Sequence, residues 1–484
     1  MLSFITGNYT DMYQLAMGEA NFLQSRHQLP VCFDYFFRRV PDGGGYVLFA
    51  GLDDLLTTLE LLRFTEEDIA FLRKCGFTDS YLDFLKDFRF RGTVYSVKEG
   101  EVVFPGCPLI RVHGTQFEVQ LIETLLLNLV NFESLIATKA SRMRYVAGER
   151  HLSDFGLRRS QGPGGVLATR AAAIGGFNST SNVYAAQLYD IPPTGTMAHA
   201  FIQSFESELE AFRAFARERP VNCVFLADTY NTLKSGIPNA ITVAKEMEQD
   251  GFRASGVRLD SGDLAWLSGA ARKMLDEAGL DYIKIVVSNQ LDEHVIKSLL
   301  DQQAPIDVFG VGTRLVTGHP DGALDGVYKL SMIDGRASLK MSDNIQKLTL
   351  PGVKQLVRIL DNDGRFFGAD AILLAEEEQA TRIFHPSEPG KSLDVTTLPQ
   401  EKLLSVVMQD GVRSQAPLHV NEIAAYAQKR LALLPGEYRR FHNPHVYKIS
   451  LSEKLLQLRT EIVEANRNIP TGNSPATAKG GSSA

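Results

Sequence analysis

The chain has 484 residues, of which 44% are apolar and 22% charged, and its formal net charge is −7. This length indicates about two to four domains, or fewer if one of them is a barrel. The acidic balance argues against general nucleic-acid affinity, because a phosphate backbone needs a basic face, so an anionic ligand requires positive charge gathered locally.

The cysteines and the apolar runs indicate the cellular compartment of the protein. The four cysteines, Cys32, Cys75, Cys107 and Cys223, are scattered and form no Cys-x-x-Cys pair. This pattern predicts neither a zinc site nor a disulfide framework, and reduced thiols in a cytoplasmic protein are the simplest interpretation. The N-terminal residues lack the features of a signal peptide, and no run approaches the ~20 apolar residues that cross a bilayer, so we expect no membrane association.

The first stretch mixes helix and strand signals. Thr10 is the expected N-cap of a helix, and residues 31–39 (VCFDYFFRR) are typical of a strand followed by a glycine-rich turn. Thr65, with Asp68 three residues later and Gly76 further on, predicts a helix with both ends capped. Short strands broken by glycine and proline are expected over residues 88–111. We therefore predict an α+β domain over residues 1–115.

A long helix and a series of strand–helix units are expected next. Apolar residues at helical spacing predict one continuous helix over residues 118–148. Four apolar runs that end in polar residues follow, and successive run ends lie 32, 29 and 24 residues apart. Such units predict a parallel sheet or a β/α barrel over residues 116–335, with chemistry at the carboxyl ends of the strands. The four runs are residues 221–228, 254–260, 283–289 and 306–313.

The pattern changes again near residue 336. Mixed segments are followed by two predicted amphipathic helices, around residues 420–434 and 452–464. We expect a C-terminal region over residues 336–467 that packs back on the first domain. The stretch 468–484 is rich in Gly, Ser, Ala, Pro and Thr and predicts a flexible tail.

A histidine beside a turn of small residues is the first candidate for chemistry. Pro192 and Pro193 send the chain into an extended or turning segment, and Gly195 and Thr196 leave room for a ligand near the backbone. His199 follows and is able to act as acid, base or nucleophile near neutral pH. The alternative is a histidine whose ring only hydrogen-bonds within a loop.

Each of two further polar stretches can be interpreted either as a ligand-binding site or as a structural feature. Arg158 and Arg159 in RRSQGP are suited to grip a carboxylate or phosphate, or they form a solvated basic loop. The stretch 175–182 (GGFNSTSN) is suited to bind a polyol or phosphate, or it caps the next helix, which is the interpretation we favour.

The stretch RLDSGD offers a cation and acids at one strand end. Arg258 and Asp260 alternate along a strand and project from the same side, which is costly to bury without partners, so we favour a functional role. Asp260 and Asp263 are candidates for ribose hydroxyls or Mg²⁺, which prefers hard oxygen ligands. The alternative is that Asp260 or Ser261 caps the following helix.

The last candidate is the glycine turn GVGTR at residues 310–314. Its exposed N–H groups and the hydroxyl of Thr313 are suited to an anion. The chain contains no P-loop, complete dinucleotide fingerprint, HExxH, GxSxG or calcium-loop pattern.

Together these motifs resemble the nicotinate phosphoribosyltransferase family. The ordered set spans roughly residues 10–358, and the order makes it much more specific than any one motif. It consists of TDMYQLAM, FDYFFRRVPDGGGYVLFAGL, RRSQGP, GGFNSTSN, GTMAHAF, GVRLDSGDL, VVSN, GVGT and KLTLPGVKQ.

This resemblance implies the fold and the reaction. The implied fold is an irregular β/α barrel of the type II phosphoribosyltransferase class, with an α+β N-terminal domain and a C-terminal segment packed on it. The implied reaction makes nicotinate mononucleotide and pyrophosphate from nicotinate and 5-phosphoribosyl 1-pyrophosphate, in NAD salvage. It is coupled to ATP hydrolysis, which makes the enzyme a ligase, and Mg²⁺ is the expected metal. A cytoplasmic homodimer with shared active sites is implied.

Roles for individual residues also come from the resemblance. His199 matches the histidine that ATP phosphorylates. Tyr13, Thr196 and Arg258 match positions that contact nicotinate, and Tyr13 is expected to come from the other subunit. Thr313, with the Gly312 amide, matches the 5-phosphate position. Arg159, Asp260, Ser288 and Asn289 match the phosphoribosyl pocket. The resemblance leaves the metal ligands unknown, and Asp260 or Asp263 stay candidates for Mg²⁺.

Three rival functions are weighed against this one. Nicotinamide phosphoribosyltransferase uses the same barrel, but Arg258 and Tyr13 favour a carboxylate over a neutral amide. A metabolite-binding barrel without catalysis is disfavoured by the presence of His199, Arg258 and Thr313. A sugar-phosphate aldolase needs a strand-end lysine or a metal cluster, and neither occurs on the four runs.

Overall fold

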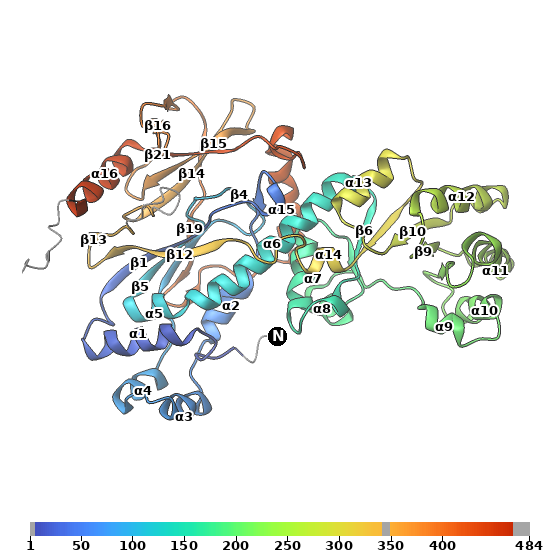
Figure 1. Cartoon of the computed structure of the whole chain (residues 1–484), viewed down its shortest axis with the longest axis horizontal. Coiled ribbons are helices and arrows are strands. Elements are labelled where there is room, and N and C mark those ends of the chain that lie inside the picture. The colour runs from blue at the N-terminus through green and yellow to red at the C-terminus, as the bar shows by residue number, and fades with distance from the viewer. Residues whose placement is uncertain (1–4, 341–348, 468–484) are drawn as a thin grey trace, which may run out of the picture.

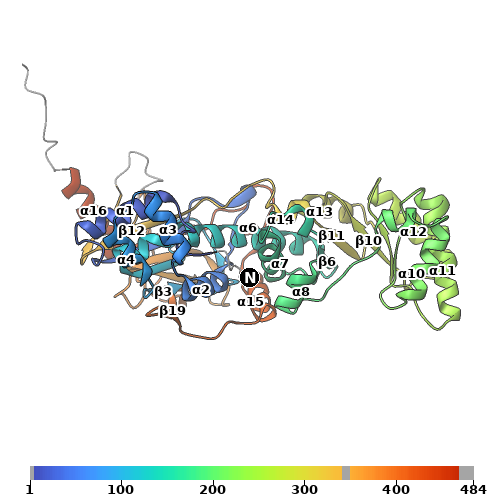
Figure 2. The same cartoon turned by 90° about the horizontal axis from the view of Figure 1, so that it is seen from below.

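Two lobes joined by one long helix make up the computed structural model, which describes residues 5–340 and 349–467. The joining helix, α6 (Glu123–Ala147), runs from the larger lobe into the smaller one, and the molecule is elongated along this direction (Figures 1 and 2). The tail predicted over residues 468–484 lies outside the described residues.

The larger lobe begins with the N-terminal α+β segment. Its elements are α1 (Met12–Leu23), β1 (Pro30–Phe37), η1 (Pro41–Gly43), β2 (Val47–Leu48), α2 (Leu52–Leu61), α3 (Glu66–Lys74), α4 (Asp79–Lys86), β3 (Thr93–Ser96), β4 (Val102–Val103), β5 (Ile110–Thr115) and α5 (Gln116–Leu121).

The smaller lobe contains the strand–helix units. Its elements are β6 (His151–Asp154), η2 (Leu157–Arg159), α7 (Gly164–Ile174), β7 (Ser179–Thr180), α8 (Val183–Tyr189), α9 (His199–Gln203), α10 (Glu208–Glu218), β8 (Val224–Leu226), the π-helical turn η3 (Thr232–Gly236), α11 (Ile237–Gln249), β9 (Gly256–Leu259), α12 (Leu264–Glu277), β10 (Lys284–Ser288), α13 (Glu293–Asp301), β11 (Val308–Val311) and α14 (Thr313–Val316).

The chain then returns to the larger lobe. The remaining elements are β12 (Gly326–Ile333), β13 (Arg336–Ala337), β14 (Lys354–Leu360), β15 (Phe366–Leu374), β16 (Arg382–Phe384), β17 (Ser392–Asp394), β18 (Gln400–Lys402), β19 (Ser405–Gln409), β20 (Val412–Arg413), α15 (Val420–Leu433), η5 (Gly436–Tyr438), β21 (Lys448–Ser452) and α16 (Glu453–Arg467).

A parallel sheet organises the smaller lobe. Its six strands lie in the order β7-β6-β11-β10-β9-β8, and every pair is parallel. All four predicted apolar runs are neighbouring strands of this sheet, with buried side chains and helices between them along the chain. The fold is therefore mixed α/β with a parallel sheet. No pairing among the described residues joins β7 to β8, so closure into a barrel stays a prediction.

Two other large sheets build the larger lobe. A seven-stranded antiparallel sheet has the order β13-β12-β1-β5-β3-β19-β20, and a six-stranded sheet has the order β17-β16-β21-β15-β14-β18. The first combines strands from before residue 115 with strands from after residue 325, such as the pair of β3 and β19. The chain therefore crosses between the lobes twice. The domain boundaries predicted from the sequence remain predictions.

Local signals at helix ends are partly confirmed. Thr65 and Asp68 form the predicted capping box of α3, and Gly76 has a positive φ of 92° just beyond its end. Thr10, by contrast, is not an N-cap: the N-cap of α1 is Asp11, and the Thr10 hydroxyl donates to the Leu121 carbonyl instead. The Thr10 hydroxyl, which was expected to cap α1, therefore forms its hydrogen bond where α1 packs against α5.

The prediction of one continuous helix over residues 118–148 is wrong, because the structure has two helices there. A capping box of Thr115 and Glu118 starts α5, which ends at Leu121, and Ile122 has ψ near −3° before α6 begins. The apolar spacing does not reveal this break, because Leu121 and Leu125 are buried on either side of it.

A buried ion network ties the C-terminal sheet to the N-terminal segment. Arg358 on β14 pairs with Asp370 on β15 at 2.9 Å and with Glu101 at 2.6 Å. Arg430 of α15 also pairs with Glu101, and Tyr447 donates to Asp370. Two cations and two anions are therefore matched in a site from which Arg358 is fully excluded from solvent.

The remaining sequence expectations concern thiols and membranes. All four cysteines are free thiols, and only Cys75 is exposed. Within residues 5–340 and 349–467, every helix is too short or too polar to span a bilayer.

Candidate active site

A cavity of about 500 Å³ lies at the carboxyl ends of β6, β9, β10 and β11. The carboxyl ends of neighbouring parallel strands meet at one edge of the sheet, which is why polar residues far apart in the sequence meet here. Nine residues that the resemblance assigned to catalysis or substrate binding line this cavity, namely Arg159, Thr196, His199, Arg258, Asp260, Ser288, Asn289, Gly312 and Thr313.

Arg258 is held at the centre of the cavity by three polar side chains. Its guanidinium donates to the hydroxyls of Ser288 (2.9 Å) and Thr196 (3.0 Å) and pairs with Asp260 at 2.8 Å. The Arg258 side chain is 15% exposed, so one side of the group remains open to the cavity. This arrangement fixes a partly desolvated cation where an anionic ligand can reach it.

His199 and Asp228 form a second hydrogen-bonded pair. His199 begins α9, and its Nε2 lies 3.2 Å from Oδ1 of Asp228, which follows β8. The other carboxylate oxygen of Asp228 accepts from the Asp260 amide at 2.8 Å and the Ser261 hydroxyl at 2.6 Å. Asp228 is 1% exposed whereas His199 is 41% exposed, so a buried acid orients an accessible imidazole.

An aromatic ring packs behind the arginine. The Phe155 ring lies 5.5 Å from the Arg258 guanidinium carbon, and both residues line the cavity. This ring occupies the space beside Gly310, where an added Cβ would come within 2.4 Å of Phe155. The glycine of the predicted turn is therefore required for the ring to approach the strand.

A buried carboxyl group shapes the loop after β6. Asp154 accepts from the hydroxyls of Thr169 (2.6 Å) and Thr180 (2.9 Å) and from the Gly156 amide (2.8 Å). Burial raises the pKa of Asp154, while these three donors oppose that rise. The network fixes the loop that carries Phe155, Arg158 and Arg159 toward the cavity.

The stretch 175–182 has the structural role that the sequence favoured. Asn182 is the N-cap of α8, and its side chain accepts from the Ala185 amide at 3.2 Å. Thr180 takes part in the Asp154 network. Only Ser181 of this stretch lines the cavity.

Tyr13 is not brought to the cavity by this chain. It lies on α1 in the larger lobe, far from β9 and β10 (Figure 1), and is 49% exposed. Within one chain the predicted nicotinate contact of Tyr13 is therefore not formed.

The two metal candidates have different surroundings. Oδ1 of Asp263 accepts from the Ala265 and Trp266 amides as the N-cap of α12, and Asp263 does not line the cavity. Asp260 lines the cavity, and its carboxylate bonds Arg258 and Ser288 through the same oxygen. The expected alternative that Asp260 or Ser261 caps the helix is wrong, because Asp263 is the cap.

Asp228, Phe155 and Gln290 are at the site but were given no role from the sequence. Asp228 ends the apolar run 221–228, so its place at a strand end was a usable signal. Phe155 carried no such signal, because a phenylalanine after a strand is usually part of the core. Arg314, also left without a role, pairs with Asp292 at 2.6 Å and does not line the cavity.

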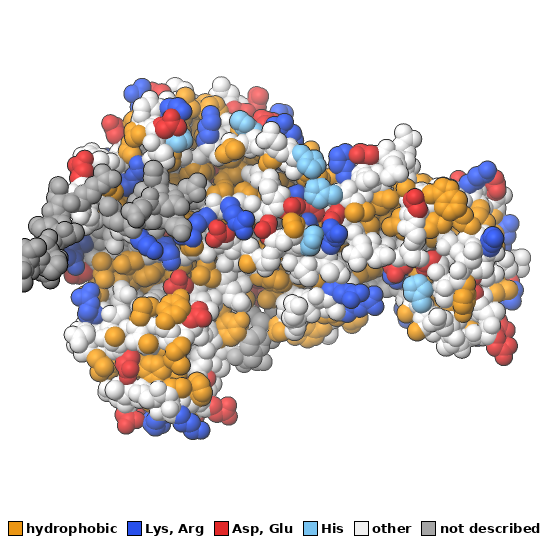
Figure 3. All heavy atoms as spheres, in the orientation of Figure 1, with side chains coloured by type: hydrophobic (Ala, Val, Ile, Leu, Met, Phe, Trp, Pro, Cys, Tyr) orange, Lys and Arg blue, Asp and Glu red, His pale blue; other side chains and the backbone are white. Residues whose placement is uncertain are grey.

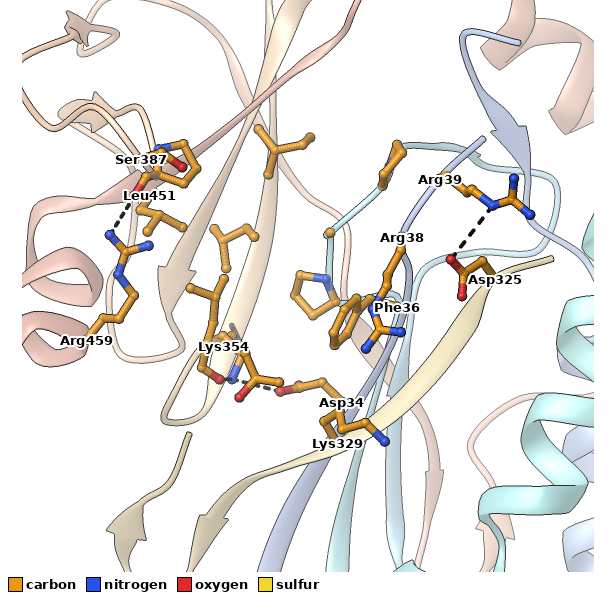
Figure 4. A pocket seen from close by; sticks show the side chains of 18 of the residues that line it. Asp34, Phe36, Arg38, Arg39, Asp325, Lys329, Lys354, Ser387, Leu451 and Arg459 are labelled. Carbon is orange, nitrogen blue, oxygen red and sulfur yellow. Dashed lines mark hydrogen bonds and ion pairs between the residues drawn. The ribbon is translucent and has the colours of Figure 1, made fainter. Parts of the chain in front are cut away.

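A second cavity, of about 700 Å³, lies in the larger lobe between β1, β12 and the C-terminal sheet (Figure 4). Arg38, Arg39 and Lys354 line it, and they come from the motifs FDYFFRRVPDGGGYVLFAGL and KLTLPGVKQ. Lys354 is buried in an ion pair with Asp34 at 2.7 Å, and Arg39 is near Asp325 at 3.9 Å. The two motifs therefore lie together at the second cavity, and none of their described residues lines the first cavity.

Models of one protein family match almost the whole chain. The nicotinate phosphoribosyltransferase N-terminal domain matches residues 9–131, the family model matches residues 150–376, and the C-terminal domain matches residues 353–459.

Relatives and solved structures agree with these matches. A nicotinate phosphoribosyltransferase of Bacillus subtilis is 43% identical and covers 92% of each chain, and one of Homo sapiens is 36% identical and covers 93% of this chain and 95% of the relative. The crystal structure of human nicotinic acid phosphoribosyltransferase matches with a TM-score of 0.84 at 33% identity, covering 94% of this chain and 99% of the other. A nicotinate-nucleotide pyrophosphorylase of Pyrococcus furiosus shares the fold, with a TM-score of 0.70 at 22% identity, covering 88% of this chain and 95% of the other.

Proposed function

This chain belongs to the nicotinate phosphoribosyltransferase family, and from that premise we propose that it makes nicotinate mononucleotide and pyrophosphate from nicotinate and 5-phosphoribosyl 1-pyrophosphate, coupled to ATP hydrolysis, in NAD salvage. The observation that carries this proposal is the meeting of Arg258, Thr196, His199 and Thr313 in one cavity.

Arg258 and Thr196 provide the site for nicotinate. A pyridine carboxylate is a planar anion, and a guanidinium already positioned by Ser288 and Asp260 pairs with it at little entropic cost. The Phe155 ring borders the same space and offers a face for the pyridine. A neutral nicotinamide gains less from this cation, so the site favours the acid.

Gly312, Thr313 and Arg159 provide the site for the phosphoribosyl group. The Gly312 amide and the Thr313 hydroxyl lie at the end of β11, where backbone N–H groups point toward an anion. Arg159 lies on η2, Ser288 ends β10 and Asn289 follows it, and all three line the cavity. The sugar is thereby fixed with its C1 directed to the pyridine nitrogen.

The chemistry demands positioning rather than a protein nucleophile on the sugar. The C1–oxygen bond to pyrophosphate breaks as the pyridine nitrogen forms its bond to C1, and positive charge develops on the ribose. Holding the two reactants in line lowers the barrier by up to about 7–11 kcal/mol, and donors directed at the departing pyrophosphate contribute further.

His199 couples ATP hydrolysis to this step. With Nε2–H donated to Asp228, the lone pair of Nδ1 remains to attack the γ-phosphorus of ATP, and the N–P bond forms as the bond to ADP breaks. Asp228 stabilises the cationic ring that results. Phosphorylated His199 then adds negative charge beside the loop 195–198, and water later releases phosphate.

The residues present fit Mg²⁺ at one place. Asp260 lines the cavity, and a single carboxylate together with substrate oxygens and water is the usual protein contribution to Mg²⁺ binding. Bound there, the ion would neutralise charge on the departing pyrophosphate. Asp263 does not fit, because its carboxylate caps α12.

Tyr13 completes the site only in a homodimer. Because Tyr13 is exposed on α1 of the larger lobe, a second subunit is able to present it to the cavity of the first. Closure of the parallel sheet into an irregular barrel is part of the same proposal.

One assay tests the function directly. Purified protein with phosphoribosyl pyrophosphate, Mg²⁺ and either nicotinate or nicotinamide is expected to form mononucleotide from nicotinate, and faster with ATP. Product from nicotinamide at an equal rate would favour the amide-using rival. Absence of product, and of isotope exchange between pyrophosphate and phosphoribosyl pyrophosphate under all conditions, would favour a binding protein.

A second experiment tests the coupling residue. With [γ-³²P]ATP and Mg²⁺ the wild-type chain is expected to acquire acid-labile, alkali-stable phosphate, and His199→Ala is expected to acquire none. Asp228→Asn keeps the shape but weakens the orientation of the ring, so slower labelling is expected. Equal labelling of wild type and His199→Ala would contradict the phosphohistidine.

A further inference from the structure

A groove of about 840 Å³ lies on the surface where the two lobes meet, away from the catalytic cavity. It is lined by the end of α6, by one face of α13 and by the segment 439–442 that follows η5. Figure 3 shows histidine and basic side chains gathered along the hollow between the lobes. None of the lining residues belongs to the catalytic cavity.

Two arginines that line the groove have no carboxylate partner among the described residues. Arg439 and Arg440 line it, and among the described residues neither has an acidic group within ion-pair distance. The Nε of Arg439 is buried, yet no hydrogen-bond partner for it is present in the described part of the chain. Lys297 is paired with Asp301, which is the one acidic lining residue described. A chain with net charge −7 thus keeps, within its described ranges, two arginines without a carboxylate partner in one groove, where Arg440 Nε donates only to the Glu437 carbonyl.

Aromatic rings lie among these cations. The Arg439 guanidinium lies over the Tyr145 ring at 4.9 Å, and Tyr145 meets Phe441 edge-on at 6.3 Å. His294 lies 5.5 Å from Phe441 and 5.8 Å from His442, measured between ring centroids. Rings beside guanidinium groups suit a ligand that combines a planar base with phosphate.

An electrically balanced cluster adjoins the groove, and its Arg142 guanidinium lies over the Phe441 ring at 5.1 Å. Glu293 is fully buried between Lys139 (2.8 Å) and Arg142 (2.9 Å), and Asp42 accepts from Arg142 at 3.0 Å. Asp42, Glu293 and His294 have ligand-type atoms within 4.8 Å of one another, but the two cations already neutralise both carboxylates, so no metal site results. The carboxylates of this cluster therefore do not neutralise Arg439 and Arg440.

We propose that this groove binds a nucleoside di- or triphosphate at a site separate from the catalytic cavity. The base stacks against Tyr145 and Phe441, and the phosphates pair with Arg439 and Arg440. The proposal does not depend on the catalytic function.

The groove is connected to the catalytic cavity through one short segment. Ser288, Asn289 and Gln290 line the cavity, and α13, which carries His294 and Lys297 into the groove, begins at Glu293. Asp292 caps α13 and pairs with Arg314, one residue after Thr313. A ligand held by α13 is thus able to shift the segment 288–292, which makes the groove a place for regulation by nucleotide level.

Photo-crosslinking locates the bound nucleotide. With 8-azido-ATP the wild-type chain is expected to be labelled on a peptide containing Tyr145 or residues 439–445, besides any label around residues 195–205. In Arg439→Glu/Arg440→Glu the groove label is expected to vanish while the other label stays. Label confined to residues 195–205, or groove label unchanged in the variant, would overturn the proposal.

Equilibrium dialysis with ATP provides the second measurement. Two ATP per wild-type chain are expected, and one in Arg439→Glu/Arg440→Glu, with Arg440→Ala weakening the second site about tenfold as a gentler change. Lys245→Glu/Lys402→Glu alters the net charge equally at exposed positions elsewhere and is expected to retain both sites. The same number of bound ATP in wild type and in Arg439→Glu/Arg440→Glu, or binding of a polyglutamate peptide in place of ATP, would reject a nucleotide site.

Discussion

Arg258 in the smaller lobe and Arg358 in the larger lobe have similar neighbours, but they differ in burial and in the charge of the groups that they bond. Each guanidinium pairs with an aspartate and lies near a phenylalanine ring. Asp260 comes just after β9, which also carries Arg258, whereas Asp370 is on β15, next to the strand of Arg358. Arg358 is fully buried and makes bonds to Glu101, Asp370 and the Val102 carbonyl. Arg258 bonds mostly to neutral hydroxyls and is 15% exposed.

The difference separates a structural cation from a binding cation. Two buried cations and two buried anions around Arg358 leave no charge for a ligand and hold β14, β15 and α15 together. Around Arg258 a single carboxylate faces the guanidinium, and that carboxylate is shared with Ser288. Substitutions at the two positions are therefore expected to change different quantities.

The largest effect is expected at Arg358. Replacing it in Arg358→Met leaves Asp370 and Glu101 buried with too few partners, which lowers the free energy of unfolding by about 3–5 kcal/mol. Urea denaturation measures this loss. Activity per folded molecule is expected to stay near that of wild type, and a loss of activity without loss of stability would contradict the structural role.

The next largest effect is expected at Arg258, where activity is expected to fall and stability to change little. Arg258→Gln removes the cation that faces nicotinate, so kcat/KM for nicotinate is expected to fall by about 10²–10³-fold. The free energy of unfolding is expected to change by less than about 1 kcal/mol, because the hydroxyl partners face the cavity. Arg258→Lys keeps the charge without the paired donors and serves as control, with an intermediate rate expected.

A smaller effect is expected at Tyr13, which extends the comparison to a second subunit. Tyr13→Ala removes an exposed side chain, so stability is expected to be unchanged while KM for nicotinate rises about tenfold, the effect of one lost stacking contact of about 1–2 kcal/mol. Mixing Tyr13→Ala with Arg258→Gln chains is expected to recover part of the activity. No recovery in mixed dimers would place Tyr13 outside the partner's site.

The smallest effect at neutral pH is expected at a titratable group without a carboxylate partner. Burial, aided by Arg111, lowers the pKa of His113 from 6.5 to about 4. The unfolded chain therefore binds the proton first, and stability is lost as pH falls from 6.5 toward 4. His113→Gln is expected to reduce the slope of Tm against pH in this window. An unchanged slope would assign the acid sensitivity to other groups.

Several features of the protein could be predicted from local patterns. The four apolar runs fix the strands β8 to β11, because buried parallel strands need apolar side chains on both faces. The capping box of Thr65 and the amphipathic helices α15 and α16 follow from spacing alone. The order of the motifs identified the family, which the comparisons confirmed.

Other features depended on contacts between distant segments. The hydrogen bond of His199 to Asp228, the packing of Phe155 on Gly310, and the break at Ile122 arise where separate elements touch. The network of Arg358 with Glu101 joins residues 257 positions apart. Local periodicity shows which side chains are buried but not which ones meet, because that choice is made only when sheets and helices pack against one another. The sequence by itself therefore determined the elements and the polar strand ends, and the tertiary structure decided which of those ends form a site.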